Sequence, residues 1–191
     1  MGRRFLGIPV SGLMALVVGC GAHPTSADVA GDEPDWVDPP PAQGAPAQGE
    51  PLHHSAGVEL TVPLGWAVQP WGEHVQLLSP DRAAVVRLMV IDTGQLEVAL
   101  DGIDRQLDGQ LEAHDLGSVR TAVVNGLKAR LAAGSGWLKG ESVKLRIALL
   151  LTPRKQVLVL LSMIRQNAVA ERQAEIRGLL GSIRPGRLSR P

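Results

Sequence analysis

Short runs of alternating apolar and polar residues predict β-strands from residue 57 onward. Residues 58–62 (VELTV) have the period of two that places successive side chains on opposite faces of a half-buried strand. Two more strands are expected over 74–78 and 83–91, with the turn sequence SPDR between them. The run at 83–91 is almost wholly apolar, which indicates a strand near the centre of its sheet.

At Thr93 the spacing of apolar residues lengthens to three or four positions. This spacing predicts an amphipathic helix of about 20 residues with Thr93 as its N-cap. Acidic residues gather on the opposite face of the helix. Because a solvated helix face normally carries such charges, we interpret them as surface rather than as a metal or acid–base site. A second helix is expected over 168–180, ended by Gly181 and Pro185.

Hairpin signals dominate the segment between the two helices. Asn125 and Gly126 form a dipeptide that favours a type I′ turn. The apolar stretch at 147–164 is interrupted by a Pro-Arg-Lys sequence, so we expect two buried strands joined by a turn rather than a membrane span. Hairpins imply antiparallel pairing, and two amphipathic helices need a sheet to cover. The sequence therefore predicts one α+β domain over residues 57–185, followed by a tail at 186–191.

Residues 1–19 have the features of a secretory signal peptide. Arg3 and Arg4 supply the positive start, an uncharged and mostly apolar run follows over 5–18, and Gly19 ends it. As a helix this run would rise about 21 Å, which is short of the roughly 30 Å that a bilayer core requires. We therefore expect a segment removed during export rather than a permanent membrane span.

Cys20, the chain's only cysteine, directly follows this segment. The sequence VVGC at 17–20 resembles the bacterial lipobox, whose cysteine thiol is alkylated by a diacylglyceryl group before cleavage exposes its amine. The resemblance implies a lipoprotein anchored in the cell membrane, with Cys20 as the lipid attachment site. Gly21 after the cysteine favours the outer membrane if the cell is Gram-negative. The alternative is an ordinary signal peptide cleaved after Ala27, which ends the small-residue sequence TSA.

Residues 20–56 predict a disordered tether. They hold seven of the chain's 14 prolines and several acidic residues, but no Lys or Arg. Such a composition cannot bury enough apolar surface to offset the entropy of ordering, so the segment would space a domain from the membrane. The adjacent residues His53 and His54 cannot readily chelate one metal ion, and we expect no metal site there.

Three short motifs mark the globular part: GVELTVPLGW at 57–66, where a strand leads into a Pro-x-Gly-Trp turn, SPD at 79–81 before a strand, and GSI at 181–183. Together with the helix in the middle of the domain, they resemble the PsbP-like domain family. This family includes plant photosystem II extrinsic proteins, a nuclear Ran-binding factor and bacterial envelope lipoproteins of the DcrB type. The resemblance implies a three-layer α/β/α sandwich with a largely antiparallel sheet, used mostly for binding and without shared catalytic residues.

The sequence has no catalytic motif and no cofactor-binding glycine loop, so we expect no catalytic residue, no metal and no cofactor. His114, at a helix end, is expected to be a surface or capping residue. Trp66 is expected in the core, whereas Trp71 is the best candidate for an exposed tryptophan, although we expect it to be half-buried rather than stacked on a ligand. We take Trp71 and His74 as the candidate contacts for a ligand or partner.

These features predict a lipid-anchored envelope lipoprotein whose domain is a non-enzymatic binding or assembly module. The expected partners are the membrane, through the lipid anchor, and an envelope protein. The scattered basic residues argue against a nucleic-acid surface. The alternative is an envelope hydrolase acting on cell-wall or lipid material, which would require a pocket that brings His74 or His114 within hydrogen-bond reach of a carboxylate or a serine with a perturbed pKa.

Overall fold

The computed structural model describes residues 49–168 and 170–186. The predicted signal peptide, Cys20 with its lipid attachment, residues 20–48 of the predicted tether and the tail beyond residue 186 lie outside the described residues. Among the helices that are described, none is long and apolar enough to cross a membrane.

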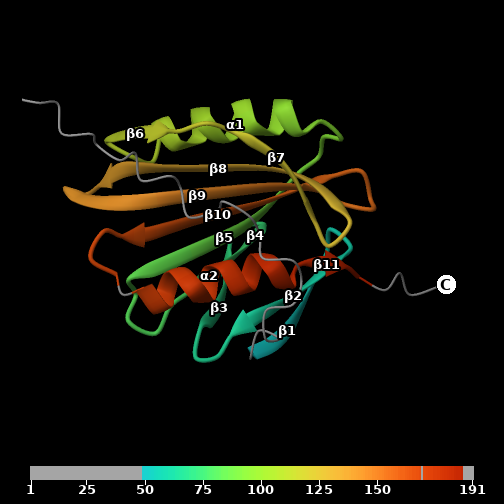
Figure 1. Ribbon diagram of the computed structural model, residues 1–191, viewed down its shortest axis with the longest axis horizontal. Helices are drawn as coiled ribbons and strands as arrows, with labels where there is room; N and C mark the ends of the chain where they lie inside the picture. The colour runs from blue at the N-terminus through green and yellow to red at the C-terminus, as the bar shows by residue number, and fades with distance from the viewer. Residues whose placement is uncertain (1–48, 169, 187–191) are drawn as a thin grey trace, which may run out of the picture. The chain divides into compact units, whose positions relative to one another are not determined.

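Strands and helices follow one another in an order close to the predicted one (Figure 1). The elements are β1 (Gly49–His54), β2 (Val58–Pro63), β3 (Ala67–Trp71), β4 (His74–Leu78), β5 (Ala84–Ile91), α1 (Leu96–Asp108), β6 (Ala113–Leu116), β7 (Arg120–Val124), β8 (Leu127–Leu138), β9 (Glu141–Leu151), β10 (Val157–Arg165), α2 (Ala170–Ser182) and β11 (Arg184–Pro185).

The strands form two antiparallel sheets. The larger sheet has eight strands in the order β3-β4-β5-β10-β9-β8-β6, with β7 also paired to β8. The smaller sheet has three strands in the order β1-β2-β11. β5 lies between β4 and β10, which confirms the interior position predicted from its apolar run.

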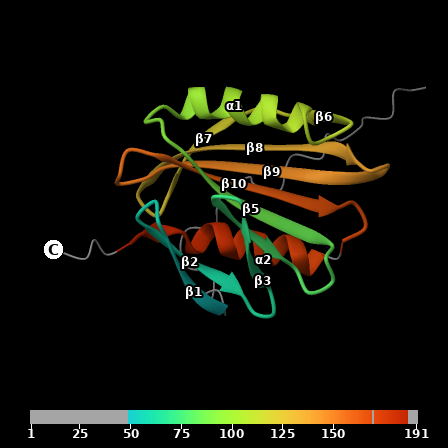
Figure 2. The ribbon, with the colours of Figure 1, turned by 180° about the vertical axis from the view of Figure 1, so that it is seen from behind.

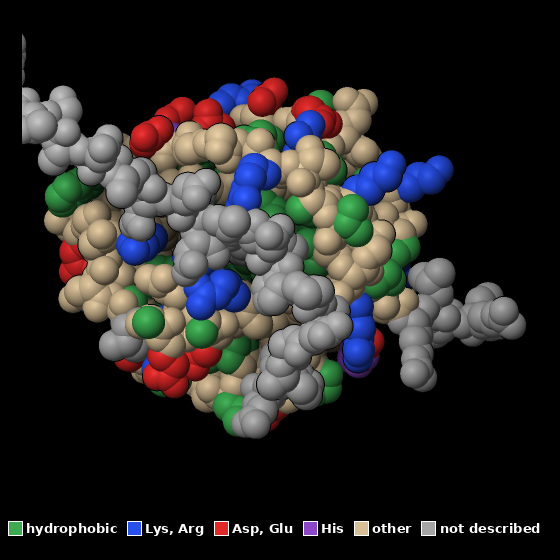
Figure 3. Space-filling model, in the orientation of Figure 1, with side chains coloured by type: hydrophobic (Ala, Val, Ile, Leu, Met, Phe, Trp, Pro, Cys, Tyr) green, Lys and Arg blue, Asp and Glu red, His purple; other side chains and the backbone are tan. Residues whose placement is uncertain are grey.

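A helix covers each face of the larger sheet (Figures 1 and 2). α1 packs on one face through Ala99, Ile103 and Leu107, which form a core cluster with the odd-numbered residues of β9 and β10. α2 packs on the other face together with the smaller sheet, and Ile176 and Leu179 join the even-numbered residues of the same strands. This three-layer arrangement confirms the predicted α+β sandwich. The outer face of α1 carries Asp and Glu side chains and Arg105, as predicted for a solvated helix face (Figure 3).

β9 and β10 are buried on both faces of the larger sheet. Val157 and Val159 face the α1 cluster and Leu158 and Leu160 face the α2 cluster, each with 0% of its surface exposed. A strand that is buried on both sides needs apolar residues at most positions, which explains the nearly continuous apolar sequences at 147–151 and 157–164; Arg146 and Ser162 are the buried polar exceptions on these strands. The predicted turn separates the two strands, and Lys155 in it has a positive φ of 57°.

The hairpin at Asn125 and Gly126 also matches its prediction. Both residues have positive φ, 46° and 85°, and the flanking residues Val124 and Leu127 pair directly, as a two-residue type I′ turn requires. The Asn125 side chain donates hydrogen bonds of 2.7 Å to the carbonyl oxygens of Gly181 and Ile183. This hairpin therefore binds the main chain at the end of α2 and does more than connect two strands.

Arg172 in α2 holds together two turns that are distant in sequence. Its Nη1 donates to Glu175 at 2.7 Å and its Nε to Asp81 at 3.1 Å. Glu175 also accepts a hydrogen bond of 3.0 Å from Trp66 Nε1, and Asp81 accepts one of 2.6 Å from Ser79 Oγ. The PLGW turn and the SPDR turn are thereby fixed to the same helix.

β1 lies before the predicted domain boundary at residue 57. All six residues of β1, Gly49–His54, pair with β2, although the sequence placed them in the disordered tether of residues 20–56. β1 contributes only Leu52 to the core. Because main-chain pairing along β2 forms this strand, and not its own apolar content, its composition did not reveal it.

Both helices differ from their predicted limits. α1 begins at Leu96 and has Gln95, not Thr93, at its N-cap position, without a side-chain cap; Thr93 Oγ1 instead accepts a hydrogen bond from Gln95 N. α1 ends at Asp108, yet Leu111 beyond it is still buried in the α1 cluster, so the apolar spacing outlasts the helix. α2 ends at Ser182, two residues later than predicted.

We predict that Asp81→Asn lowers the free energy of unfolding at neutral pH by about 1 kcal/mol, the usual net value of a hydrogen bond. Hydrogen bonds from Ser79 and from the Ala83 amide, followed by the contact with Arg172, lower the pKa of Asp81 to about 2. Because the folded-state pKa lies below the unfolded value, this stabilisation is complete above about pH 4 and is lost as the pH falls through about 2.

Urea unfolding of both proteins between pH 7 and pH 2 tests this prediction. The difference in unfolding free energy between wild type and Asp81→Asn should shrink as the pH falls from about 4 to 2. Asp101→Asn, on the exposed face of α1, is the matched control and should change stability by less than about 0.5 kcal/mol. A difference for Asp81→Asn that is independent of pH would contradict the assigned cause.

Candidate functional site

A cleft of about 340 Å³ opens on the face of the larger sheet that α1 only partly covers. α1 packs mainly against β9 and β6, and so leaves the same face of β3 and β4 without a helix (Figures 1 and 2). We call this feature the Trp71–Arg87 cleft; its lining residues are Trp71, Arg87, Gln110, Leu138 and Met163. An adjoining hollow of about 290 Å³ shares Leu138 and Met163 with it.

The strand register brings Trp71 and Arg87 to the same face. Trp71 is opposite His74 at the closed end of the β3–β4 hairpin, and Gln76 on β4 is opposite Arg87 on β5. On β5, Arg87 lies between two residues of the α1 cluster, so alternation directs its side chain toward α1. Gln110 arrives from the turn that follows α1.

The Arg87 guanidinium is held by a ring and two amides. Its carbon atom Cζ lies 4.1 Å from the centroid of the Trp71 ring, a cation–π contact. Its Nη1 donates to Gln110 Oε1, and its Nε donates to Gln76 Oε1 at 3.4 Å. Both acceptors are neutral, and no carboxylate of the described residues lies within ion-pair distance of Arg87.

Arg87 is partly buried, which is an unusual environment for a charged side chain. Partial burial lowers the pKa of Arg87 from its ordinary value, although a guanidinium stays protonated at neutral pH. The His74 ring lies 5.7 Å from the Trp71 ring, centroid to centroid. Burial, and to a lesser extent the nearby His74, lowers the pKa of His54. The cleft therefore combines a positive charge with aromatic and apolar walls.

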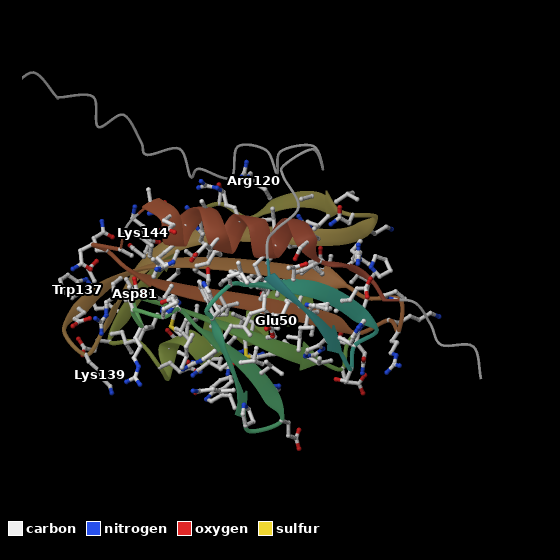
Figure 4. All side chains as sticks on the ribbon, turned by 90° about the horizontal axis from the view of Figure 1, so that it is seen from below. Glu50, Asp81, Arg120, Trp137, Lys139 and Lys144 are labelled. Atoms are coloured by element: carbon white, nitrogen blue, oxygen red, sulfur yellow. The ribbon has the colours of Figure 1, made fainter. Side chains whose placement is uncertain are left out.

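Of the residues singled out from the sequence, Trp71 and His74 lie together at the cleft. Trp71 is half-buried, and the strongly exposed tryptophan is Trp137, with 50% of its surface accessible, near the β8–β9 turn (Figure 4). The half-buried state of Trp71, with Arg87 over its ring, is as expected, but Trp71 as the best candidate for an exposed tryptophan was wrong, because Trp137 is the more exposed of the two among the described residues. Trp66 is 6% exposed, which confirms its predicted place in the core.

Arg87 and Gln110 are site residues that sequence reasoning missed. Arg87 had a visible signal, since it is the only charged residue in the apolar run of β5. Gln110 had none, because only the position of α1 over the sheet brings its side chain to Arg87.

His114 lies at the edge of the larger sheet, away from the lining of the cleft. Its Nε2 lies 2.9 Å from Asp104 Oδ1 and its Nδ1 lies 3.7 Å from Asp108 Oδ1, so it links β6 to α1. His114 therefore makes the carboxylate contact that the hydrolase alternative requires, but it lines neither of the two hollows. No serine or threonine hydroxyl of the described residues hydrogen-bonds to His74 or His114. In the same part of the chain, no group of three or more His, Cys, Asp or Glu side chains is placed to hold a metal ion.

Comparison with known proteins identifies the fold. No protein-family model matches the chain, and no curated protein matches its sequence. Its structure is similar to that of CyanoP, the cyanobacterial PsbP of Synechocystis, with a TM-score of 0.57 and 10% identity over 74% of this chain and 94% of CyanoP. It is also similar to LpqN of Mycobacterium tuberculosis, described as involved in cell envelope biogenesis, with a TM-score of 0.54 and 15% identity over 72% of this chain and 90% of LpqN.

A protein of Bacteroides thetaiotaomicron is a third similar structure, with a TM-score of 0.51 and 11% identity over 75% of this chain and 50% of that protein. At such low identities the similarity concerns the fold alone. The described part of the chain thus has the PsbP-like fold that the sequence motifs predicted.

We predict that Trp71 and Arg87 stabilise each other by about 0.5–1 kcal/mol, as expected for a partly desolvated cation–π pair. A double-mutant cycle with Trp71→Leu, Arg87→Gln and the double variant measures this coupling from urea unfolding. A cycle that pairs Trp71→Leu with Arg105→Gln, on the exposed face of α1, should give a coupling near zero. Equal couplings in the two cycles would show that the contact is not stabilising.

Proposed function

We propose that this protein is a lipoprotein of the bacterial cell envelope, anchored through Cys20, and that its PsbP-like domain binds a ligand or partner without performing chemistry. The position of Cys20 carries the proposal, because the only cysteine of the chain directly follows a segment with the features of an export signal. The LpqN description supports an envelope role, since it links a protein of the same fold to cell envelope biogenesis. The outer membrane is the proposed location if the cell is Gram-negative.

The segment between Cys20 and β1 would act as the spacer between membrane and domain. Its prolines favour extended conformations of up to about 3 Å per residue, so the domain would stand tens of ångströms from the lipid surface. With β1 included in the domain, this spacer ends near residue 48 rather than at residue 56. An anchored domain of this kind would meet an envelope protein or a small molecule that is too far from the membrane for a shorter linker.

The Trp71–Arg87 cleft is the proposed binding site of the domain. It places a charged group that has only neutral partners beside an aromatic ring and apolar side chains. Binding sites are typically concave, largely apolar and supplied with a few polar groups that orient the ligand.

We predict that Cys20→Ser abolishes lipid labelling of the protein. Cells fed an alkyne-bearing fatty acid should label the wild type, and mature-size wild type should sediment with membranes. Ala27→Arg, which blocks ordinary cleavage after Ala27, is the control and should leave both labelling and size unchanged. Labelled Cys20→Ser, or a mature-size Cys20→Ser protein that stays on membranes, would refute the anchor. Loss of processing in Ala27→Arg would instead support the ordinary signal peptide.

We also predict that binding by the domain depends on the cleft. In membranes from cells with the full-length protein, a chemical crosslink to an envelope protein should weaken several-fold in Trp71→Leu and persist in Trp137→Leu. Trp137→Leu is the matched control because the same residue types are exchanged at an exposed position near the end of β8. A crosslink that is lost only in Trp137→Leu would move the binding surface to β8.

A further inference from the structure

We propose that the Trp71–Arg87 cleft binds a small organic carboxylate that carries an apolar group, with the carboxylate on Arg87 and the apolar group on Leu138 and Met163. This inference rests on the proposed function as a binding module and names the class of ligand. Three observations carry it: the hydrogen-bonding capacity of Arg87, the charge around it, and the apolar surface beside it.

Arg87 has hydrogen-bond donors to spare. A guanidinium has five N–H donors in a planar fork, and Arg87 uses one to Gln76 and one to Gln110. Trp71 covers one face of the group and limits its rotation. A guanidinium held in this way is arranged to donate two parallel hydrogen bonds to a planar acceptor, and a carboxylate is the acceptor whose geometry fits best.

Among the residues that the structure describes, no carboxylate lies within ion-pair distance of Arg87. Four other arginines contact a carboxylate: Arg130 with Glu97, Arg165 with Glu141, Arg172 with Asp81 and Glu175, and Arg184 with Glu59. Arg87 is half-buried, but its hydrogen-bond acceptors are the neutral side-chain amides of Gln76 and Gln110 instead of a carboxylate. A partly desolvated charge without a counter-ion favours the arrival of an anion.

The amount of charge favours a carboxylate over a phosphate. Arg87 is the one Lys or Arg among the residues that line the Trp71–Arg87 cleft. A single guanidinium matches a carboxylate with one negative charge, whereas a phosphate monoester carries about −1.5 to −2 at neutral pH. The adjoining hollow is also lined by Arg82, Lys139 and Arg165, of which Arg165 is already paired with Glu141 at 3.1 Å.

The apolar part of the ligand is indicated by the wall that the two hollows share. Leu138 and Met163 belong to both, and the adjoining hollow continues over Val85 and Val143. A short aliphatic group attached to a carboxylate on Arg87 would be transferred from water onto this apolar surface. The cleft volume of about 340 Å³ lies at the small end of the range for ligand sites, which indicates a small molecule rather than a long chain.

Calorimetric titration with hexanoate tests the inference on the full-length protein held in lipid nanodiscs, with empty nanodiscs as the blank. We expect saturable binding of hexanoate to the wild type and none of hexanol, which has the same chain without the charge. Hexyl phosphate should bind more weakly than hexanoate. Arg87→Gln should weaken hexanoate binding about tenfold or more, the effect of losing a charge-assisted hydrogen bond. The matched control Arg105→Gln should bind as the wild type does.

Trp71→Leu is the second variant, in case Arg87→Gln fails to fold; thermal unfolding of each variant checks this. Trp71→Leu should weaken hexanoate binding several-fold and leave hexanol unchanged. Equal hexanoate affinity in the wild type and in either folded variant, tighter binding of hexyl phosphate, or no saturable hexanoate binding would each overturn the inference. If hexanoate did not bind but the crosslink to an envelope protein still weakened in Trp71→Leu, only the proposed ligand class would be overturned. If lipid labelling and membrane sedimentation did not depend on Cys20, the proposed anchor would be overturned and the proposed ligand class would be unaffected.

Discussion

The pairing of β9 with β10 is the constraint on which the rest of the structure depends. The two strands pair over residues 143–165 of the chain and are buried on both faces, so every side chain along most of their length needs an apolar neighbour. A sheet whose central strands are apolar on both sides cannot face water on either. The layers formed by α1 on one side, and by α2 with the small sheet on the other, follow from this requirement.

The layers on the two faces of the larger sheet differ in how many strands they cover, and this difference leaves room for the cleft. On one face, α2 and the three-stranded sheet together reach across to β5 and β4 through Trp66 and Leu77. On the other face, α1 has 13 residues and packs over β9 and β6. Trp71 and Arg87 occupy the face that remains, and their stacked side chains close it only in part.

Local signals in the sequence were sufficient to predict most helices and strands. The contacts in the candidate site depend instead on strand pairing between residues that are distant in sequence. Asn125 and Gly126 determine their turn by their own backbone preferences, so the sequence predicted that hairpin correctly. β1 was missed because it depends on its partner β2. In the same way, the contacts of Arg87 with Gln76 and Gln110 arise from the pairing of β4 with β5 and from where α1 ends, and no local pattern encodes either.

Stability alone does not account for an arginine at the position of Arg87. The neighbouring residues of β5 are apolar, and a leucine or methionine there would pack on Trp71 and Met163 without the cost of desolvating a charge. Replacing buried ionic groups by apolar ones of similar volume is often neutral or stabilising. The cation–π contact and two hydrogen bonds offset part of this cost, yet they also hold the guanidinium in one orientation. A group that is both costly to bury and fixed in direction is what the proposed role of Arg87 in binding an anion requires.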